Sequence, residues 1–572
     1  MTTKTIKDGT VADAYLHLLA DRGIEYFFGN AGTDFAPLIE SFAKAQALGT
    51  PTPKAIMVPH ENVAIHMAMG YTMVTGKPQV VMVHVNVGTA NSLNGIINAS
   101  RGNIPVIFSS GRTPYTETGD KHGKRTREVH WPQEMFDQGA LAREMVKWDY
   151  ELKDKAVLET VVDRAINMAM SEPKGPIYLT LPREPLAETY DEYSFSSPSR
   201  RATPTAGYPD PDAIDQAAEM LANATNPVII TQDSGADPKA VAPLAALAQR
   251  FAIPVVQRKN RFLCLPSNHP MHLGYDSDPF LDEADVIIVA SCDVPWIPSV
   301  KSPRADCKII HMGADPIFAG YPIRGYECDL GITGAMAPSF RLLDDALATR
   351  EKSAASRIDT RRKAMAELRA RQHEAAKAAF EKTRNSRPLG PAYIANCINT
   401  AKTDDSIVIT ESAFAMSQVE FNTPGSFFSG GAGGGLGYGL GMALGAKLAA
   451  PEKLVICTQG DGAYLYGNPV PAHYTGKAEG LPMLTVIMNN EEWGAVKRNT
   501  RGMYPDGYAA RSNNEPLTFF EPGGIQFEKA AEMSGGYGEM VDDPDELPKA
   551  LDRAIDQVMG QGKQAVLNVK CR

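Results

Sequence analysis

Short, continuous runs of apolar and mostly β-branched residues recur along the chain and alternate with longer stretches rich in Ala, Leu and Met. Such runs are typical of strands that are buried on both faces, as in parallel sheets covered by helices. The pattern therefore predicts an α/β fold of doubly wound, mainly parallel sheets. The clearest predicted strands are PQVVMVHV (78–85), IPVIFSS (104–110), DVIIVAS (285–291), KLVICTQ (453–459) and MLTVIMN (483–489).

Two segments interrupt this alternation and indicate domain boundaries. The polar segment 194–211 contains several Pro and Ser residues and predicts a linker. The stretch 345–390 is rich in Ala and charged residues and has high helical propensity. A chain of 572 residues is too long for one hydrophobic core. We expect three α/β domains, at 1–190, 191–345 and 375–572, with a helical linker at 346–374.

Composition narrows the class of protein. The chain has 57 Lys and Arg residues against 67 Asp and Glu, so a concentrated basic surface for nucleic acid is not expected. Its seven Cys residues show no CxxC spacing, which indicates neither a zinc site nor a disulfide framework and favours the reduced cytoplasm. No signal peptide and no long apolar stretch is evident, so we expect no membrane association.

Polar residues follow two of the predicted strands. Gly460, Asp461 and Gly462 come directly after one strand, and Asn489 and Asn490 end the next, with Asn490 29 positions after Asp461. In open α/β sheets, ligands bind at the carboxyl ends of the strands. A carboxylate, an amide oxygen and a backbone carbonyl suit Mg²⁺ that also binds phosphate oxygens. The glycines let the backbone approach a diphosphate, toward which the next helix directs its first amides.

This arrangement resembles the signature of thiamine diphosphate enzymes, in which GDG precedes NN by a similar distance. The resemblance implies that Mg²⁺ is held by side-chain oxygens of Asp461 and Asn490 and by the backbone carbonyl of Glu492. It also implies that Gly460, Gly462 and Ala463 lie against the diphosphate of thiamine diphosphate.

A second motif is PHENVAIHMAMGYTMVTG (59–76), which resembles the first-domain segment of the benzoylformate decarboxylase and acetolactate synthase families. Gly70, Tyr71 and Gly76 match the spacing of these families. The cofactor needs a carboxylate that converts the exocyclic amine of its aminopyrimidine to an imine, and Glu61 is identified as this group. A glutamate that interacts only with the helix dipole is the structural alternative.

The glycine-rich segment 430–449 is the third motif. A dinucleotide-binding loop is disfavoured, because no strand is predicted before it and no register gives GxGxxG. In the families that the chain resembles, this segment carries an apolar residue that bends the cofactor into a V shape. The match implies this role for Leu436, and it implies that the Gly434 carbonyl accepts a hydrogen bond from the aminopyrimidine.

The substrate side resembles benzoylformate decarboxylase more than acetolactate synthase. Thr33 takes the place of a serine that contacts the substrate carboxylate, and His84 takes that of a histidine that transfers a proton. A histidine side chain, whose pKa lies near neutral pH, suits this proton transfer. The second catalytic histidine of that family would fall near 291–299, where the chain has none. His130 and Gln133 are candidates to replace it, although His130 is also consistent with a purely structural residue.

The resemblance implies a 2-oxo acid decarboxylase or carboligase whose enamine intermediate is protonated or condensed with a second carbonyl. It further implies a homodimer or homotetramer with active sites at the subunit interface, an aminopyrimidine-binding first domain and a diphosphate-binding third domain. An acetolactate synthase-like ligase, a 2-hydroxyacyl-CoA lyase and a catalytically silent regulatory protein stay open as alternatives. Whether the central domain binds flavin or a nucleotide also stays open.

Overall fold

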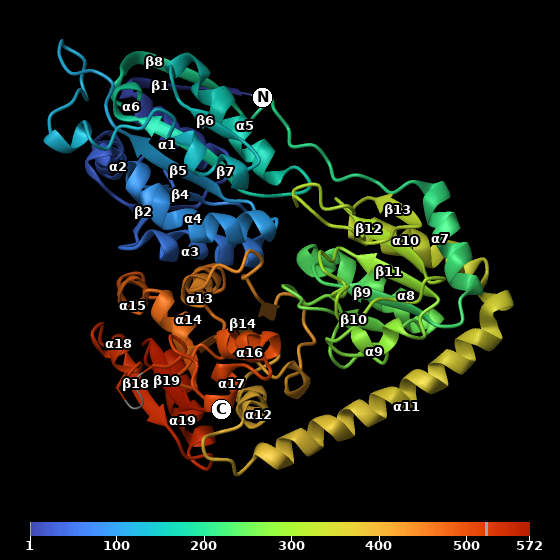
Figure 1. Ribbon diagram of the computed structural model, residues 1–572. Coiled ribbons are helices and arrows are strands. Elements are labelled where there is room, and N and C mark those ends of the chain that lie inside the picture. The colour runs from blue at the N-terminus through green and yellow to red at the C-terminus, as the bar shows by residue number, and fades with distance from the viewer. Residues whose placement is uncertain (1, 521–523) are drawn as a thin grey trace.

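The computed structural model describes residues 2–520 and 524–572. Its strands form three parallel sheets and one antiparallel pair. Figure 1 shows the three α/β units that result, with the N-terminal unit above the C-terminal unit and the central unit beside both. The prediction of an α/β fold with mainly parallel sheets is confirmed.

The N-terminal sheet has the strand order β3-β2-β4-β5-β7-β6. The predicted runs at 78–85 and 104–110 contain β4 and most of β5, and both strands are buried, as their apolar composition requires. A two-stranded arm of β1 (Thr2–Thr10) and β8 (Thr189–Ser197) lies over this unit. The other strands are β2 (Tyr26–Asn30), β3 (Lys54–Met57), β4 (Val80–Val83), β5 (Ile107–Arg112), β6 (Asp149–Glu151) and β7 (Ile177–Pro182), and the helices are α1 (Val11–Asp21), α2 (Ala36–Leu48), α3 (Glu61–Thr75), α4 (Val85–Arg101), α5 (Leu158–Met170) and α6 (Arg183–Ala187).

The central sheet has the order β10-β9-β11-β12-β13. The long helix α11 (Glu351–Thr383) leaves this unit and crosses to the C-terminal one, so the helix expected at 346–374 extends to residue 383. The elements of the central unit are β9 (Pro227–Thr231), β10 (Val255–Gln257), β11 (Val286–Ala290), β12 (Lys308–Gly313), β13 (Leu330–Thr333), α7 (Pro211–Asn223), α8 (Val241–Phe251), α9 (Asp278–Leu281) and α10 (Met336–Ala348).

The C-terminal sheet has the order β15-β14-β16-β17-β19-β18. Its two-residue strand β15 precedes the glycine-rich segment, where the sequence indicated no strand; two residues are too few to leave a recognisable apolar run. The strands are β14 (Ile407–Glu411), β15 (Phe427–Phe428), β16 (Val455–Gly460), β17 (Leu484–Asn489), β18 (Tyr537–Val541) and β19 (Ala565–Lys570), and the helices are α12 (Pro391–Ala401), α13 (Tyr438–Ala449), α14 (Asp461–Tyr466), α15 (Pro469–Ala478), α16 (Gly494–Met503), α17 (Tyr508–Ser512), α18 (Lys529–Glu532) and α19 (Leu547–Ile555).

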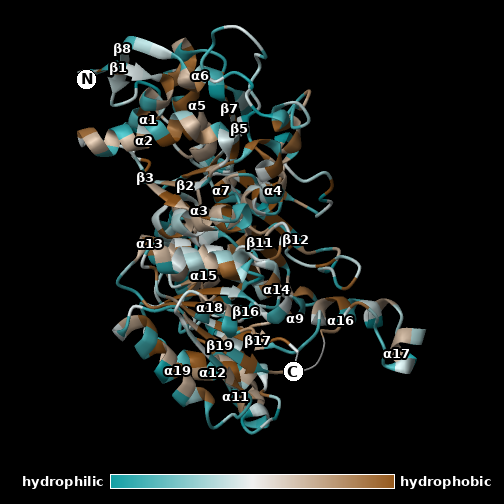
Figure 2. Cartoon of the chain, turned by 90° about the vertical axis from the view of Figure 1, so that its left-hand side faces the viewer, coloured by the Kyte–Doolittle hydropathy of each residue, from teal (hydrophilic) through white to brown (hydrophobic). Residues whose placement is uncertain are grey.

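Helices α3 and α13 join the N-terminal and C-terminal units, and they lie side by side in both views (Figures 1 and 2). Glycines allow their backbones to touch. A Cβ atom on Gly70 would lie 2.1 Å from the backbone oxygen of Met442, and one on Gly445 would lie 2.0 Å from that of Met67. No side chain fits at either position without a separation of the helices, because the obstructing atoms belong to the backbone.

Buried apolar side chains form clusters that join the strands of each sheet to the helices beside them. Figure 2 shows that α17 extends away from the body of the chain. Among the described residues, no helix is both long enough and apolar enough to span a membrane.

The contact between α3 and α13 can be tested by its effect on stability. We expect Gly445→Val to lower the free energy of unfolding by roughly 1–3 kcal/mol or more, because its Cβ would overlap the backbone of α3. Gly502→Val in α16 is the matched control, since nothing lies within 4 Å of that position. Chemical denaturation measures both. Equal losses in the two variants would contradict the close contact.

Candidate active site

The carboxyl ends of β16 and β17 bring Asp461 and Asn490 together. These strands are adjacent and parallel, with Gly460 opposite Met488, so the residues that follow them meet at one edge of the sheet. The Asp461 carboxylate accepts hydrogen bonds from the backbone N–H groups of Asn490 (3.1 Å) and Glu491 (2.7 Å). Residues 29 positions apart in sequence thus form one cluster at the edge of the sheet.

The oxygen atoms of this cluster fit a hard divalent cation. Burial raises the pKa of Asp461, although backbone hydrogen bonds oppose the shift, so a cation beside its carboxylate would favour the ionised form. No described residue donates a hydrogen bond to the Glu492 carbonyl. No group of three or more His, Cys, Asp or Glu residues in the described chain could hold a metal. A metal here would depend on amide and backbone oxygens, which Mg²⁺ accepts.

Gly462 is required for a steric reason. A Cβ atom at this position would lie 2.4 Å from the Trp493 ring, which also packs against Phe520 with their centroids 5.4 Å apart. Trp493 therefore covers the GDG turn and is half-buried. Gly460 faces open space, and Ala463 is buried at the start of α14.

The N-terminus of α3 places Glu61 next to α4. His60 caps the helix by accepting a hydrogen bond from the Asn62 N–H at 3.1 Å. The Glu61 side chain is buried, and its carboxylate accepts a hydrogen bond from the Asn91 amide at 3.2 Å. Asn94, one turn further along α4, donates to the Asn62 side chain at 3.0 Å. Helix α4 thus orients the first turn of α3.

The same face of α4 holds the glycine-rich segment. The Asn94 amide also donates to the Leu436 carbonyl at 2.8 Å, and the Asn98 amide donates to the Gly435 carbonyl at 2.9 Å. These contacts bring the segment that carries Leu436 beside the helix that carries Glu61. Leu436 is 38% exposed, and Gly434 adopts a left-handed φ of 77°.

Sequence reasoning missed these asparagines. Asn91, Asn94 and Asn98 recur at a helical spacing and so share one face of α4, which was a usable signal. It also missed Glu411 at the end of β14, whose carboxylate accepts hydrogen bonds from the N–H groups of Gly437 (2.5 Å) and Gly439 (2.6 Å). Complete burial raises the pKa of Glu411 to about 7, although these hydrogen bonds oppose the shift.

A second cluster lies at the carboxyl ends of β2 and β4. His84 follows β4, and the short 3₁₀ helix η1 (Thr33–Phe35) follows β2. The Asp34 carboxylate lies 2.6 Å from His84 Nδ1, and the imidazole packs against Gly32, where a Cβ atom would overlap the ring. The exposed Thr33 borders this cluster and makes no side-chain hydrogen bond to a described residue.

Gln133 joins the cluster from the long loop after β5. Its side-chain amide lies 3.2 Å from His84 Nε2, and the Asn86 amide donates to its backbone carbonyl at 2.9 Å. The hydrogen bond with Asp34 raises the pKa of His84, and burial opposes this shift. His84 therefore holds a proton more strongly than a free imidazole does.

His130 has a different environment. It ends the 3₁₀ helix η2 (Glu128–His130), is buried, and accepts a hydrogen bond from the Thr126 N–H at 3.2 Å. Burial and the charge of Arg183 lower its pKa. Within the described chain His130 forms no hydrogen bond with His84, whereas Gln133 does. At the site of the absent second histidine, Trp296 packs into the core of the central unit.

The carboxyl ends of the central strands hold a buried ionic cluster. The Arg261 guanidinium pairs with Asp233, and its Nη1 lies 3.2 Å from Asp293. Tyr321 donates to Asp293 at 3.0 Å. These side chains occupy part of the edge at which open α/β sheets place nucleotides.

The ionic contact of His84 can be tested by pH titration. We expect Asp34→Asn to lower the pKa of His84, because the replaced carboxylate no longer stabilises the imidazolium. Since the native pKa is raised, the pair stabilises the fold below the ordinary histidine pKa, and this contribution is lost as pH rises through the native value. NMR titration of His84 gives the pKa. An unchanged value would refute the assignment; Asp120→Asn in an exposed loop is the control.

Comparison of the sequence with models of known protein families gives three matches. Residues 9–141 match the N-terminal TPP binding domain of thiamine pyrophosphate enzymes, 214–343 match their central domain, and 409–569 match their C-terminal TPP binding domain. Together these matches cover most of the chain.

Curated relatives span nearly the full length. Sulfoacetaldehyde acetyltransferase of Alcaligenes xylosoxydans xylosoxydans is 27% identical over 98% of this chain and 93% of its own. Benzoylformate decarboxylase of Pseudomonas aeruginosa is 25% identical over 85% of this chain and 87% of its own. A solved thiamine diphosphate-dependent 4-hydroxybenzoylformate decarboxylase of Rhodococcus jostii shares the fold, with a TM-score of 0.77, 22% identity and 99% of both chains covered. The chain therefore belongs to the thiamine pyrophosphate enzymes, in the group that contains benzoylformate decarboxylase and acetolactate synthase.

Proposed function

We propose that this enzyme decarboxylates a 2-oxo acid and then either releases the aldehyde or joins it to a second carbonyl compound. The observation that carries the proposal is the contact of the Asp34 carboxylate with His84 Nδ1, because it raises the pKa of an imidazole at a strand end of the N-terminal domain.

The diphosphate end of the cofactor is assigned to the C-terminal domain. Asp461 and Asn490 would hold Mg²⁺ through their side chains and Glu492 through its carbonyl, while Gly460, Gly462 and Ala463 would face the diphosphate. The buried Asp461 carboxylate, with a pKa raised by burial, supports this assignment, because a cation compensates a buried negative charge.

Glu61 is proposed to hydrogen-bond the aminopyrimidine, and the Asn91 amide fixes the carboxylate for this contact. Leu436 would support the bend of the cofactor, and the Gly434 carbonyl would accept from the aminopyrimidine. When bound, thiamine diphosphate supplies an electron sink for cleavage next to a carbonyl. The protein residues orient it and move protons.

On the substrate side, Thr33 would bind the carboxylate, and His84 would deliver a proton from Nε2. Asp34 holds the opposite nitrogen, so the imidazole keeps its orientation as its charge changes. Gln133 would orient His84 and bind substrate, while His130 would act from the neighbouring loop in its neutral form, which its lowered pKa favours.

We further propose a homodimer or homotetramer in which Glu61 of one subunit serves the cofactor held by Asp461 of another. Large apolar side chains lie exposed on the segment just after the proposed metal ligands, with Tyr504 60% and Tyr508 86% exposed. Figure 2 shows α17 extended away from the body of the chain. A second copy of the chain would cover these side chains.

A second candidate is acyl transfer or ligation. Two sulfoacetaldehyde acetyltransferases are 26–27% identical over 98–99% of this chain, a longer match than that of benzoylformate decarboxylase at 85%. In this alternative the same residues act, but the acceptor of the acyl group differs from that of the first proposal.

Glu61→Gln tests the cofactor assignment. We expect thiamine diphosphate to stay bound, because the diphosphate contacts are intact, while turnover falls by orders of magnitude, because the amide cannot take the proton role of the carboxylate. Calorimetric binding of the cofactor and steady-state turnover are the measurements. Wild-type turnover in this variant would exclude the mechanism, and Glu40→Gln on the exposed surface of α2 is the matched control.

Product analysis separates the two candidate reactions. Pyruvate and aromatic 2-oxo acids should release CO₂ and yield an aldehyde or a hydroxyketone. Sulfoacetaldehyde is assayed in parallel. Consumption of sulfoacetaldehyde without CO₂ release from any 2-oxo acid would favour acyl transfer and contradict the first proposal.

A further inference from the structure

Helix α4 carries one stripe of polar residues along its length. The stripe consists of Asn91, Asn94, Asn98 and Arg101. Their spacings are three, four and three positions, so all four share one face of the helix. The asparagines contact Glu61 and the glycine-rich segment. Arg101 ends α4 on the side of the N-terminal unit that faces the central unit (Figure 1). The stripe therefore extends from the candidate active site toward a second domain.

Asn98 is the fully buried member of this stripe and holds the glycine-rich segment at three points. Its side-chain oxygen accepts hydrogen bonds from the backbone N–H groups of Gly433 (3.2 Å) and Gly435 (3.1 Å), and its amide donates to the Gly435 carbonyl (2.9 Å). Asn98 lies about one helical turn before Arg101, so the C-terminal end of α4 sets the position of this segment. The segment carries Leu436, which is proposed to contact the cofactor.

The Arg101 guanidinium contacts the loop that follows β12 in the central unit. Its Nη1 donates to the Gly320 carbonyl at 2.5 Å, and its central carbon lies 5.1 Å from the centroid of the Tyr321 ring. A guanidinium over the face of an aromatic ring is attracted by the ring electrostatically. The carbonyl and the ring together thus fix the end of α4 to the central domain.

Tyr321 joins this contact to the buried ionic cluster of the central unit. Its hydroxyl donates to the Asp293 carboxylate at 3.0 Å, and the same carboxylate oxygen lies 3.2 Å from Arg261 Nη1. Arg261 is 4% exposed and also pairs with Asp233. Such a buried pair holds its geometry, because separation of the partners would leave an unpaired buried charge. Tyr321 is therefore held in place from within the central domain.

Arg261 also contacts the C-terminal domain, directly before the glycine-rich segment. Its backbone carbonyl accepts a hydrogen bond from the Ser429 N–H at 3.1 Å. The adjacent residues Phe262 and Phe428 form an isolated β-bridge, with their ring centroids 5.8 Å apart. The central domain thus contacts both α4 and the glycine-rich segment. The residues of this interdomain link are Arg101, Tyr321, Asp293 and Arg261.

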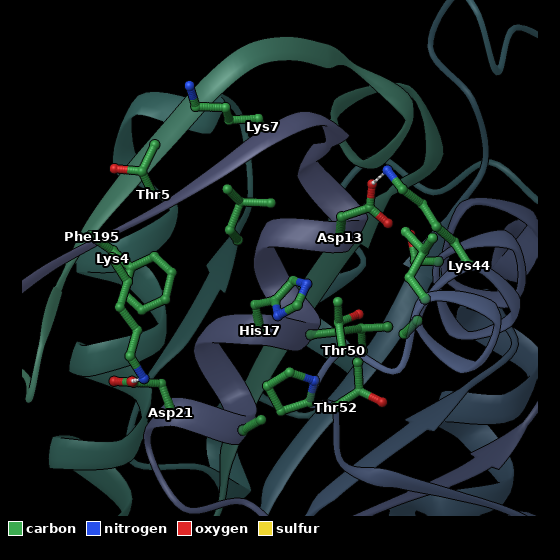
Figure 3. Close-up of a pocket in the computed structure, with 17 residues that line it drawn as sticks. Lys4, Thr5, Lys7, Asp13, His17, Asp21, Lys44, Thr50, Thr52 and Phe195 are labelled. Atoms are coloured by element: carbon green, nitrogen blue, oxygen red, sulfur yellow. Dashed lines mark hydrogen bonds and ion pairs between the residues drawn. The ribbon is translucent and has the colours of Figure 1, made fainter.

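The ionic pairs beside the β1–β8 arm differ from the interdomain link. A hollow of about 530 Å³ lies between this arm, α1 and α2. Figure 3 shows two pairs at the hollow, Lys4 with Asp21 and Lys44 with Asp13. Both pairs join elements of the N-terminal domain only, so they stabilise one domain, whereas the interdomain link connects three.

We propose that Arg101 and Tyr321 are positioning residues for the cofactor site. Through them the central domain holds the C-terminal end of α4, and with it Asn98 and the glycine-rich segment, in the geometry that binds thiamine diphosphate. This inference rests on the proposed function, because it uses the cofactor contacts assigned to Glu61 and Leu436. It gives the central domain a role in cofactor binding through its contacts with the other two domains.

Calorimetric titration of the cofactor-free enzyme with thiamine diphosphate and Mg²⁺ tests the proposal. We expect Arg101→Met to weaken cofactor binding roughly tenfold. Tyr321→Phe should weaken it less, because the ring under the guanidinium remains and only the hydroxyl is lost. Turnover at saturating cofactor should stay close to that of the wild type, since neither residue belongs to the proposed catalytic groups. The matched controls are Arg341→Met and Tyr208→Phe, at two exposed positions.

Hydrogen exchange of the cofactor-free enzyme gives a readout that does not depend on the reaction. The amides of Gly433 and Gly435, which donate to Asn98, should exchange faster in Arg101→Met than in the wild type. The double variant Arg101→Met/Tyr321→Phe should bind thiamine diphosphate no more weakly than Arg101→Met alone, because the two residues act in series.

Wild-type cofactor affinity and exchange in folded Arg101→Met would overturn the proposal, and so would losses that multiply in the double variant. A fall in turnover at unchanged cofactor affinity would also overturn it, because it would place these residues in the chemical step. Failure of the wild type to bind thiamine diphosphate would contradict the proposed function together with this inference. Thermal unfolding verifies that each variant is folded, and Tyr321→Phe carries the test by itself if Arg101→Met does not fold.

Discussion

The backbone contact between α3 and α13 is the interaction on which the rest of the site depends. Gly70 and Gly445 let two helices from separate domains approach until a Cβ atom would overlap the opposite backbone. At this distance the first turn of α3, with Glu61, and the loop before α13, with Leu436, both reach the asparagine face of α4. A change in helix separation would move both groups, because each belongs to one of the packed helices or to the loop that enters it.

Parallel sheets produce the other two clusters of the site in a similar way. In each domain the strands end at the same edge, so side chains that follow neighbouring strands meet there. Asp461 and Asn490 meet beyond β16 and β17, and Asp34 and His84 meet beyond β2 and β4. In the central domain, the same geometry brings Arg261 and Asp233 together in a buried ion pair. One architectural rule thus forms the cluster proposed for metal binding, the cluster proposed for proton transfer and a structural ion pair.

Local patterns were sufficient for the strands of the α/β fold, because burial on both faces imposes apolar runs. They were insufficient for residues whose role is to orient another side chain. Asp34, Asn91 and Glu411 carry no motif of their own, and their partners lie 26 to 50 positions away in the sequence.

The sequence by itself determined the fold class, the cofactor family and the candidate metal ligands, since these depend on residue types and on spacings along single strands. Tertiary structure decided which side chains hold Glu61, Leu436 and His84, because those contacts join elements from different parts of the chain. It also decided that Arg101 meets Tyr321, which no spacing indicates, because α4 and the loop after β12 come together only when two domains pack against each other.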